Sequence, residues 1–277
     1  MRTPSGFIDL YSLPLYYDVL HGPGTAKDVR GLARISKAFG TGVTESPIWL
    51  EPACGSGRYL RAAARDGVRT IGFDLEPAMV EYAQALAKAE GSKGQTYFVA
   101  DMQDFDRTHK VPKVDFAFNL INTIRHLPSD RAVLAHLSAV TRVLKRKAVY
   151  AVGMSMCVYG HEPEVEDVWK GRRAGLGVLQ NITYIPAPGG RGAGARIERV
   201  ISHLTVTRGA AATEPIEHID STYGLRSYNL REWAGLVERS EFEAIAVVDE
   251  RGRVTPPPVL GYCIWVLRRK SSPHAVG

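Results

Sequence analysis

Acidic side chains stand at the ends of three successive apolar runs, and a glycine turn follows the first of them. Glu51 lies near the end of "IWLEPA", Asp74 near the end of "RTIGFDL", and Asp101 directly after "TYFVA". Gly55 and Gly57 separate the first run from a helical pattern, and glycine permits positive φ and a close approach of the backbone to a ligand. If that ligand is a nucleoside, Asp74 can accept hydrogen bonds from ribose hydroxyls and Asp101 can hold an adenine amino group. The pattern predicts a nucleoside-binding loop.

Glu51 indicates which charge the group attached to the nucleoside carries. A carboxylate beside the turn repels a pyrophosphate but attracts an ammonium or sulfonium cation. The third glycine of a dinucleotide fingerprint is also missing, because Arg58, Tyr59 and Leu60 follow Gly57. A nucleoside with a cationic tail is therefore favoured, and a nicotinamide-dependent dehydrogenase is disfavoured.

Apolar runs and helical patterns alternate between residues 48 and 154. Helices are expected over 57–66, 77–88 and 130–144, each following a strand-like run or lying between two of them. Strands are expected at 48–53, 69–75, 96–100, 113–120 and 148–154. This alternation predicts a doubly wound, mostly parallel α/β sheet with ligands at the carboxyl ends of its strands.

The alternation of strand-like and helical patterns ends after residue 154. Three strand-like stretches lie between 171 and 226, and the loop "APGGRGAGA" joins the first two, which predicts a small antiparallel sheet. An amphipathic helix beginning near residue 229 and two strands, 243–249 and 261–269, then complete a sheet of seven strands. We therefore expect a Rossmann-like fold in three parts: an N-terminal lid segment and core at 1–156, an inserted antiparallel subdomain at 157–228, and the return of the core at 229–277.

The bulk composition is that of an ordinary globular protein. Of 277 residues, 45% are hydrophobic and 23% are charged, and no apolar run is long enough to span a bilayer. Cys54, Cys157 and Cys263 lie far apart and have neither metal-ligand nor disulfide-framework spacing. We expect no metal, no membrane contact and a reducing, cytoplasmic location.

The formal net charge of +6 raises the question of nucleic-acid binding. The cations are scattered, however, and the densest runs, at 145–147 and 268–270, follow an expected helix and lie near the chain end. Cations in such places usually serve helix ends or solubility. A nucleic-acid partner is disfavoured.

Four stretches resemble, in order, the motifs of class I S-adenosylmethionine-dependent methyltransferases. They are "LEPACGSGRYL", "TIGFDLEPAMVEYAQ", "FVADMQDF" and "VDFAFNLINTIRHL", and the resemblance covers residues 16–152 and the chain from 229 onward. It implies S-adenosylmethionine as cofactor and S-adenosylhomocysteine as product. The sequence departs from the family at Ala53, where a glycine is frequent, and at the basic run 145–147, where a turn with Pro and Gly is usual before the fifth strand.

The resemblance implies a set of cofactor-binding residues. It places Glu51 near the methionine moiety and Asp101 with Met102 at the adenine, whereas Met79 fits the core as well as a cofactor wall. The full set is Tyr17, Glu51, Ala53, Gly55, Gly57, Asp74, Leu75, Met79, Asp101, Met102, Gln103 and Asn119.

"YYDVLHGPG" and "NTIRHL" resemble small-molecule N-methyltransferases, notably the aminosugar N,N-dimethyltransferases and glycine N-methyltransferase. This implies a small polar acceptor, methylated on an amine. Tyr17 is expected to act as a lid over the cofactor and is, with His126, a candidate catalytic residue. His126 is a candidate general base or a structural hydrogen-bonding group, Asn119 and Asn122 are expected to offer it or the acceptor hydrogen bonds, and His136 is expected at the surface.

Several alternatives stay open at this stage. O-methylation of a hydroxylated metabolite would use the same base, and net charge alone supports an RNA or protein methyltransferase. A non-catalytic, cofactor-sensing module would share the same loop. A homodimer is compatible with a chain of this kind, and the acceptor itself is not specified.

Overall fold

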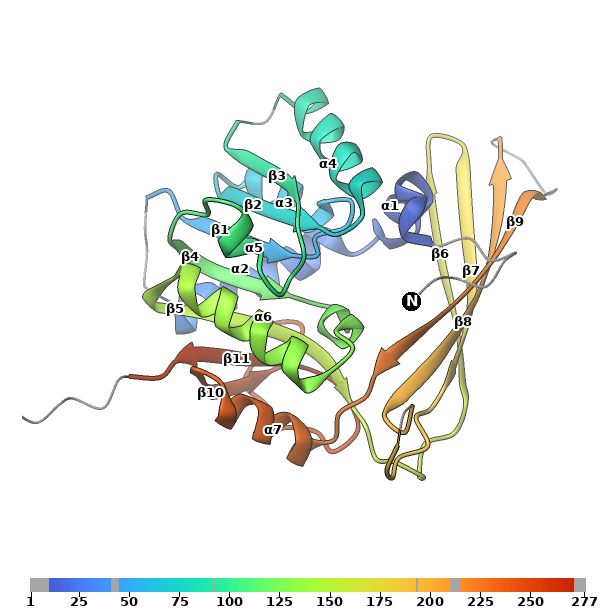
Figure 1. Cartoon of the computed structure of the whole chain (residues 1–277). Coiled ribbons are helices and arrows are strands. Elements are labelled where there is room, and N and C mark those ends of the chain that lie inside the picture. Colours follow the sequence, from blue (N-terminus) through green and yellow to red (C-terminus); the bar gives the residue numbers. More distant parts are fainter. Residues whose placement is uncertain (1–9, 41–44, 92, 193, 210–214, 272–277) are drawn as a thin grey trace, which may run out of the picture.

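The computed structural model describes residues 10–40, 45–91, 93–192, 194–209 and 215–271. Two sheets organise it: seven strands in the order β10-β11-β5-β4-β1-β2-β3, and four in the order β6-β7-β8-β9 (Figure 1). The predicted α/β fold with an antiparallel insertion is confirmed.

The larger sheet is parallel in its centre and antiparallel at one edge. Strands β1 to β5 pair in parallel, and β11 runs antiparallel to both β5 and β10. Their bounds are β1 Ile48–Pro52, β2 Arg69–Asp74, β3 Gln95–Val99, β4 Val114–Asn119, β5 Leu144–Met156, β10 Phe242–Val248 and β11 Gly261–Arg269. Every residue of β1 and β4 is buried, as expected for strands covered on both faces.

Helices cover both faces of this sheet. One core packs α6 and α7 against the strands through Val133, Leu137 and Trp233, and a second packs α2, α3 and α4 through Leu32, Leu60 and other apolar residues. The helices are α1 Pro14–His21, α2 Thr25–Phe39, α3 Arg58–Arg65, α4 Pro77–Ala89, α5 Phe105–Thr108, α6 Asp130–Val143 and α7 Leu230–Arg239, with short 3-10 turns η1 Leu10–Ser12 and η2 Thr123–His126. Among the described residues, no helix is long and apolar enough to cross a membrane.

The inserted sheet contains a strand that the sequence did not predict. Its strands are β6 Val165–Arg173, β7 Leu176–Ile185, β8 Ile197–Arg208 and β9 Pro215–Arg226, and β6 is the unexpected one. The β6 sequence "VEDVWKGRR" is highly charged, and among the described strands β6 lies at an edge and pairs with β7 alone. Edge strands often carry such charges, which hide the alternation of a half-buried strand.

Helix α1 lies between the core and the inserted sheet (Figure 1). Val19 and Leu20 pack with Val178, Leu204 and other buried side chains of that sheet. The N-terminal segment is thus held by apolar contacts to the insertion.

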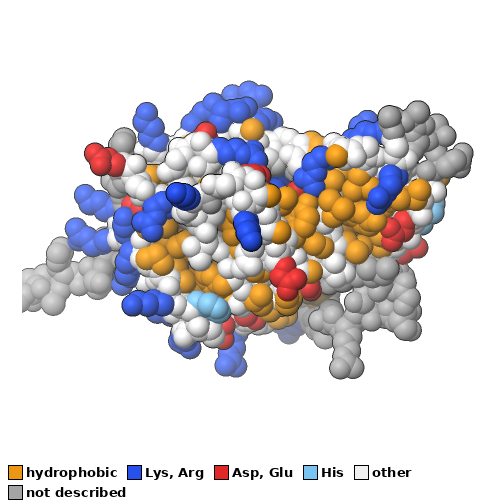
Figure 2. Space-filling view, turned by 90° about the horizontal axis from the view of Figure 1, so that it is seen from above, with side chains coloured by type: hydrophobic (Ala, Val, Ile, Leu, Met, Phe, Trp, Pro, Cys, Tyr) orange, Lys and Arg blue, Asp and Glu red, His pale blue; other side chains and the backbone are white. Residues whose placement is uncertain are grey.

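Figure 2 shows one face of the molecule, on which Lys and Arg side chains lie over both the core and the inserted sheet, while hydrophobic side chains gather most densely toward the half with the inserted sheet.

Two local expectations were wrong. The basic run 145–147 lies within β5, which begins at Leu144, rather than in a turn. Lys145 forms an ion pair there with Asp115 at 2.7 Å. His136 is fully buried rather than at the surface. Its ring nitrogens lie 3.0 Å from the Met102 carbonyl oxygen and 2.7 Å from the Tyr150 hydroxyl, and burial lowers its pKa to about 4.

A buried ion network centred on Asp18 joins the N-terminal helix to the rest of the chain. Asp18 is only 2% exposed and accepts hydrogen bonds from Ser56 Oγ at 2.6 Å, from Arg61 Nη2 at 3.0 Å and from Arg173. Burial opposes its ionisation, but Arg61 and the hydrogen bonds from Ser56 and Arg173 outweigh burial and hold its pKa below the usual value. Helix α1, the glycine turn, α3 and β6 therefore meet at one carboxylate.

We expect Asp18→Ala to lower the free energy of unfolding by about 3–5 kcal/mol, because it removes the nearest carboxylate from the buried Arg61, whose other ion pair, with Glu90, is longer at 3.5 Å. Urea denaturation followed by circular dichroism measures this, with the exposed Glu81→Ala as control. Because the folded-state pKa of Asp18 is lowered, its contribution is complete above the ordinary carboxyl pKa and is lost as pH falls through the lower value. A loss no larger than that of the control would contradict this role.

Candidate active site

A cavity of about 500 Å³ lies at the carboxyl ends of β1, β2 and β3. Most of the site residues predicted from the sequence line it: Tyr17, Glu51, Ala53, Gly55, Asp74, Leu75, Asp101, Met102, Gln103 and His126. Three predicted residues, Gly57, Met79 and Asn119, are not in its lining. Parallel strands explain the convergence, since their carboxyl ends meet at one edge of the sheet.

The turn after β1 is left-handed at three positions. Gly55 and Gly57 have φ of 53° and 70°, and Ala53 has φ of 50°. A Cβ at position 57 would lie 2.8 Å from the Tyr97 ring, so this glycine is required by packing as well as by φ. At position 53 a glycine would adopt the same conformation without the strain that alanine carries, which accounts for the frequent glycine there.

Glu51 is a buried carboxylate in need of a partner. It is 6% exposed, and its Oε2 has no hydrogen-bond partner within the described parts of the chain. Burial raises its pKa well above the usual value, Arg58 acts in the opposite direction, and Asp74 adds to the increase. An unpaired buried carboxylate in a cavity wall is costly without a ligand, and a cation would satisfy it.

Asp74 and Asp101 organise the backbone around them. Asp74 Oδ2 accepts the Gly55 N–H at 2.7 Å and Oδ1 accepts the Glu76 N–H at 3.0 Å, while burial raises its pKa in spite of these bonds. Asp101 Oδ1 accepts the Gln103 N–H at 2.8 Å. Both Asp74 oxygens and Asp101 Oδ2 accept one hydrogen bond each and keep a lone pair for a ligand.

Tyr17 and His21 form an aromatic pair at the cavity wall. They lie four residues apart on α1, with ring centroids 4.5 Å apart, and the Tyr17 ring packs close to Gly55. Burial raises the pKa of Tyr17 to about 12, and burial together with Arg58 lowers the pKa of His21 to about 3. His21 is therefore a neutral group at neutral pH. It was not among the predicted site residues, although its helical spacing from Tyr17 was a usable signal.

His126 is held by two tyrosines from distant parts of the chain. Its Nε2 lies 3.0 Å from the Tyr11 hydroxyl, and its ring stacks on Tyr223 of β9 at a centroid distance of 5.6 Å. No spacing in the sequence predicts either tyrosine, because they approach only when η1 and the inserted sheet close on η2.

The two asparagines before His126 bond to the ends of strands. Asn119 Nδ2 donates to the Pro52 carbonyl at 2.8 Å, and the Asn122 side chain accepts the Ser155 N–H at 2.7 Å. These two hydrogen bonds stabilise the strand ends rather than His126.

A strained turn follows β4. Ile121 and Asn122 have φ of 51° and 62°, although neither is glycine. The Tyr262 hydroxyl accepts the Ile121 N–H at 3.1 Å, and the Gly153 carbonyl accepts the Asn122 N–H at 3.0 Å. Such conformations cost about 1–3 kcal/mol each and cluster at functional sites.

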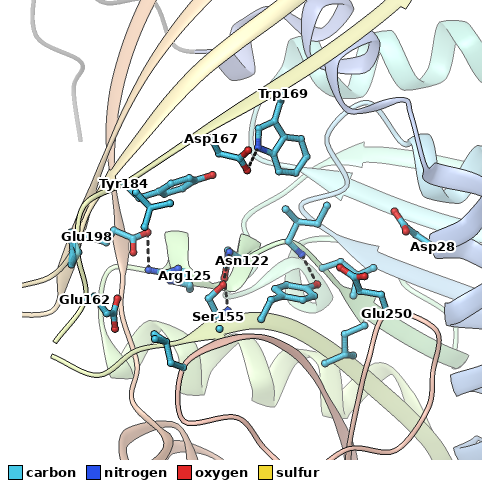
Figure 3. Close-up of a pocket in the computed structure, with 18 of the residues that line it drawn as sticks. Asp28, Asn122, Arg125, Ser155, Glu162, Asp167, Trp169, Tyr184, Glu198 and Glu250 are labelled. Atoms are coloured by element: carbon cyan, nitrogen blue, oxygen red, sulfur yellow. Dashed lines mark hydrogen bonds and ion pairs between the residues drawn. The ribbon is translucent and has the colours of Figure 1, made fainter.

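A second cavity of about 570 Å³ adjoins the first (Figure 3). The two cavities share part of their lining, including the strained Ile121 and Asn122 and the aromatic Trp169 and Tyr184. The second cavity continues from there toward Tyr262 and the loop after β10. Among the described residues, no group of His, Cys, Asp and Glu side chains is arranged to hold a metal ion.

Comparisons with known proteins agree with this geometry. Residues 50–147 match a family model described as a methyltransferase domain. A comparison with curated protein sequences finds no match.

Solved structures cover nearly the whole chain. An S-adenosylmethionine-dependent methyltransferase from Clostridium acetobutylicum is 11% identical with a TM-score of 0.67, and covers 93% of this chain and 97% of its own. The sugar N-methyltransferase KedS8 from Streptoalloteichus is 18% identical with a TM-score of 0.65, at 98% and 99% coverage. CalS10, an amino pentose methyltransferase from Micromonospora echinaspora, is 17% identical with a TM-score of 0.61, at 96% and 99%. At such identities the likeness shows the fold.

Residues 50–147 thus match a methyltransferase domain. The whole chain has the fold of S-adenosylmethionine-dependent methyltransferases, which small-molecule N-methyltransferases share.

We expect the affinity for S-adenosylmethionine to increase with pH through the raised pKa of Glu51, because a cationic ligand binds the ionised carboxylate and releases its proton. The increase is at most about tenfold per pH unit for one proton. Isothermal titration across pH measures it, with Glu51→Gln expected to weaken binding and flatten the profile and Glu81→Gln expected to leave both unchanged. A Glu51→Gln profile that matches the parent would remove Glu51 from the cation site.

Proposed function

We propose that this enzyme transfers a methyl group from S-adenosylmethionine to the nitrogen of a small polar amine. The observation that carries the proposal is the layout of the 500 Å³ cavity, where strand-end acids line one side and Gln180, Tyr184 and Tyr223 of the inserted sheet line the other. A donor on the first side would face an acceptor on the second. KedS8 and CalS10, whose fold this chain shares, are described as sugar and amino pentose methyltransferases, which supports an amine on a small molecule.

The donor is proposed to lie along the strand ends. Glu51 would pair with a cationic group of the methionine moiety, Asp74 with the ribose hydroxyls, and Asp101 with the adenine, flanked by Leu75, Met102 and Gln103. Tyr17, packed over Gly55, would close the cavity as a lid. Gly57, Met79 and Asn119 would support the cavity wall without contacting the donor. Met79 and Asn119 are buried, and Asn119 binds the Pro52 carbonyl.

The inserted part, residues 157–228, is proposed to form the acceptor side between the core segments 1–156 and 229–277. Its β9 supplies Tyr223 against His126, and its β7 supplies Gln180 and Tyr184 to the cavity wall. Substrate choice would then belong to the insertion.

Alignment should dominate the rate enhancement. The sulfonium already activates the methyl group, so the amine nitrogen must attack in line with the carbon–sulfur bond, and such orientation is worth about 7–11 kcal/mol. A general base adds roughly 10²–10⁴-fold. The amine must lose its proton before attack, and His126 is the proposed acceptor of that proton, directly or through the Tyr11 hydroxyl at 3.0 Å.

We expect Asp74→Asn to weaken S-adenosylhomocysteine binding by about 10-fold to 100-fold, because a hydrogen bond to a charged group contributes about 1.5–3 kcal/mol. Isothermal titration measures it, with Asp104→Asn, an exposed acid outside the cavity, as the matched control. Thermal unfolding of both variants separates lost binding from lost folding. Unchanged affinity would contradict the ribose assignment.

We expect His126→Ala to reduce kcat by about 10²–10⁴-fold with little change in donor affinity. In the parent the rate should rise with pH through the titration of a histidine, since only the neutral ring accepts a proton. His218→Ala, an exposed histidine on β9, is the control.

A loss below tenfold, with the same pH profile in the variant, would contradict the base assignment. It would indicate that the cavity desolvates the amine and lowers its pKa, so that no protein base is needed.

A further inference from the structure

The charge of the second cavity is opposite to that of the protein as a whole. Although the chain carries +6, five carboxylates line this cavity against a single guanidinium, and no described lysine joins them. The charged lining residues are Asp28, Glu162, Asp167, Glu198, Glu250 and Arg125. A closed wall of one sign focuses the electrostatic potential inside a cavity.

The single guanidinium does not offset the excess. Arg125 is buried and pairs with Glu198 at 3.1 Å, and it also donates to the Arg226 carbonyl at 2.9 Å. The other four carboxylates form no ion pair with a described Lys, Arg or His. The lining therefore contains four more carboxyl groups than guanidinium groups.

These carboxylates come from separate elements and lie at both ends of the cavity. Figure 3 shows Glu162 and Glu198 at one end and Asp28 and Glu250 at the other. The arrangement is therefore not a local acidic stretch of chain. It surrounds an open volume of about 570 Å³, enough for a small organic molecule.

Aromatic side chains connect this volume to the proposed site of methyl transfer. Trp169 and Tyr184 line both cavities, and Trp169 Nε1 donates to Asp167 at 2.9 Å, which fixes its ring. Aromatic faces attract cations, and here they stand where a molecule would pass from one cavity to the other.

We propose that the second cavity holds the part of the acceptor remote from the methylated nitrogen, and that this part carries a second positive charge and no phosphate. The acceptor class is then a small diamine, such as a diamino sugar. A phosphorylated or nucleotide-linked amine would bring negative charges against the carboxylates, at a cost in affinity. This inference rests on the proposed function, because it deepens the choice of acceptor.

Three sugars that differ at one carbon test it: glucosamine, its phosphate ester at carbon six, and the diamino sugar with an amino group at that carbon. Isothermal titration into enzyme saturated with S-adenosylhomocysteine should show the diamino sugar binding at least about tenfold more tightly than glucosamine, the effect of one partly screened charge pair. The phosphate ester should bind more weakly than glucosamine. Added salt should reduce both differences.

The double variant Glu162→Gln with Glu250→Gln should bind glucosamine and the diamino sugar with similar affinities. The matched control, Glu164→Gln with Glu243→Gln, removes the same charge from exposed positions outside both cavities and should keep the preference. Equal binding of glucosamine and the diamino sugar by the parent, tighter binding of the phosphate ester than of glucosamine, or an unchanged preference for the diamino sugar in the double variant would each overturn the inference.

Turnover separates the two hypotheses. Methylation of glucosamine or its phosphate ester without a preference for the diamino sugar would contradict the inference of a second positive charge on the acceptor. It would remain compatible with the proposed N-methylation. Donor binding without methylation of any of the three amines, together with methylation of a hydroxylated sugar lacking amino groups, would overturn the proposed function, and the dicationic acceptor with it.

Discussion

The buried carboxylate of Asp18 is the contact on which the arrangement of the site depends. It binds Ser56 in the glycine turn, Arg61 on α3 and Arg173 on β6, so the donor loop, the core and the insertion share one ionic centre. A buried charge needs all its partners, because its desolvation is compensated only when they are in place. The positions of α1 and β6 relative to the glycine turn are therefore coupled. Tyr17, one residue earlier on α1, is consequently placed over Gly55.

Acidic side chains line both cavities. Glu51 presents an oxygen without a described partner to the cavity at the strand ends, and five carboxyl groups with one guanidinium line the adjoining cavity. Both features cost free energy of folding when no ligand is bound, and both attract cationic ligands. S-adenosylmethionine is itself a sulfonium with an ammonium group, and a protonated amine is a second cation. The linings of both cavities contain more acidic than basic side chains, whereas the chain as a whole carries a net charge of +6.

Backbone strain is concentrated at the same place. Of the four described non-glycine residues with left-handed φ, Ala53, Ile121 and Asn122 line the cavities, and Ala174 lies in the turn between β6 and β7. The turn after β4 keeps its shape because Tyr262 and Gly153, from β11 and β5, accept its N–H groups. Strain of this kind persists only when surrounding structure fixes it. The wall between the two cavities is thus a rigid element built from three neighbouring strands.

The core and the donor side of the site follow from local sequence patterns. Alternating apolar runs specify the parallel strands, and because such strands end at one edge of a sheet, the pattern alone is sufficient to bring Glu51, Asp74 and Asp101 together. The helical spacing of Val133, His136 and Val140 also places His136 on the buried face of α6.

The acceptor side depends instead on contacts between distant segments. Strand β6 is too charged to be recognised as a strand, and Tyr11, Tyr223 and the acids of the second cavity come from parts of the chain that are far apart in sequence. No local pattern encodes how an inserted sheet docks, since docking depends on side-chain packing against α1 and on the ion pairs of Asp18.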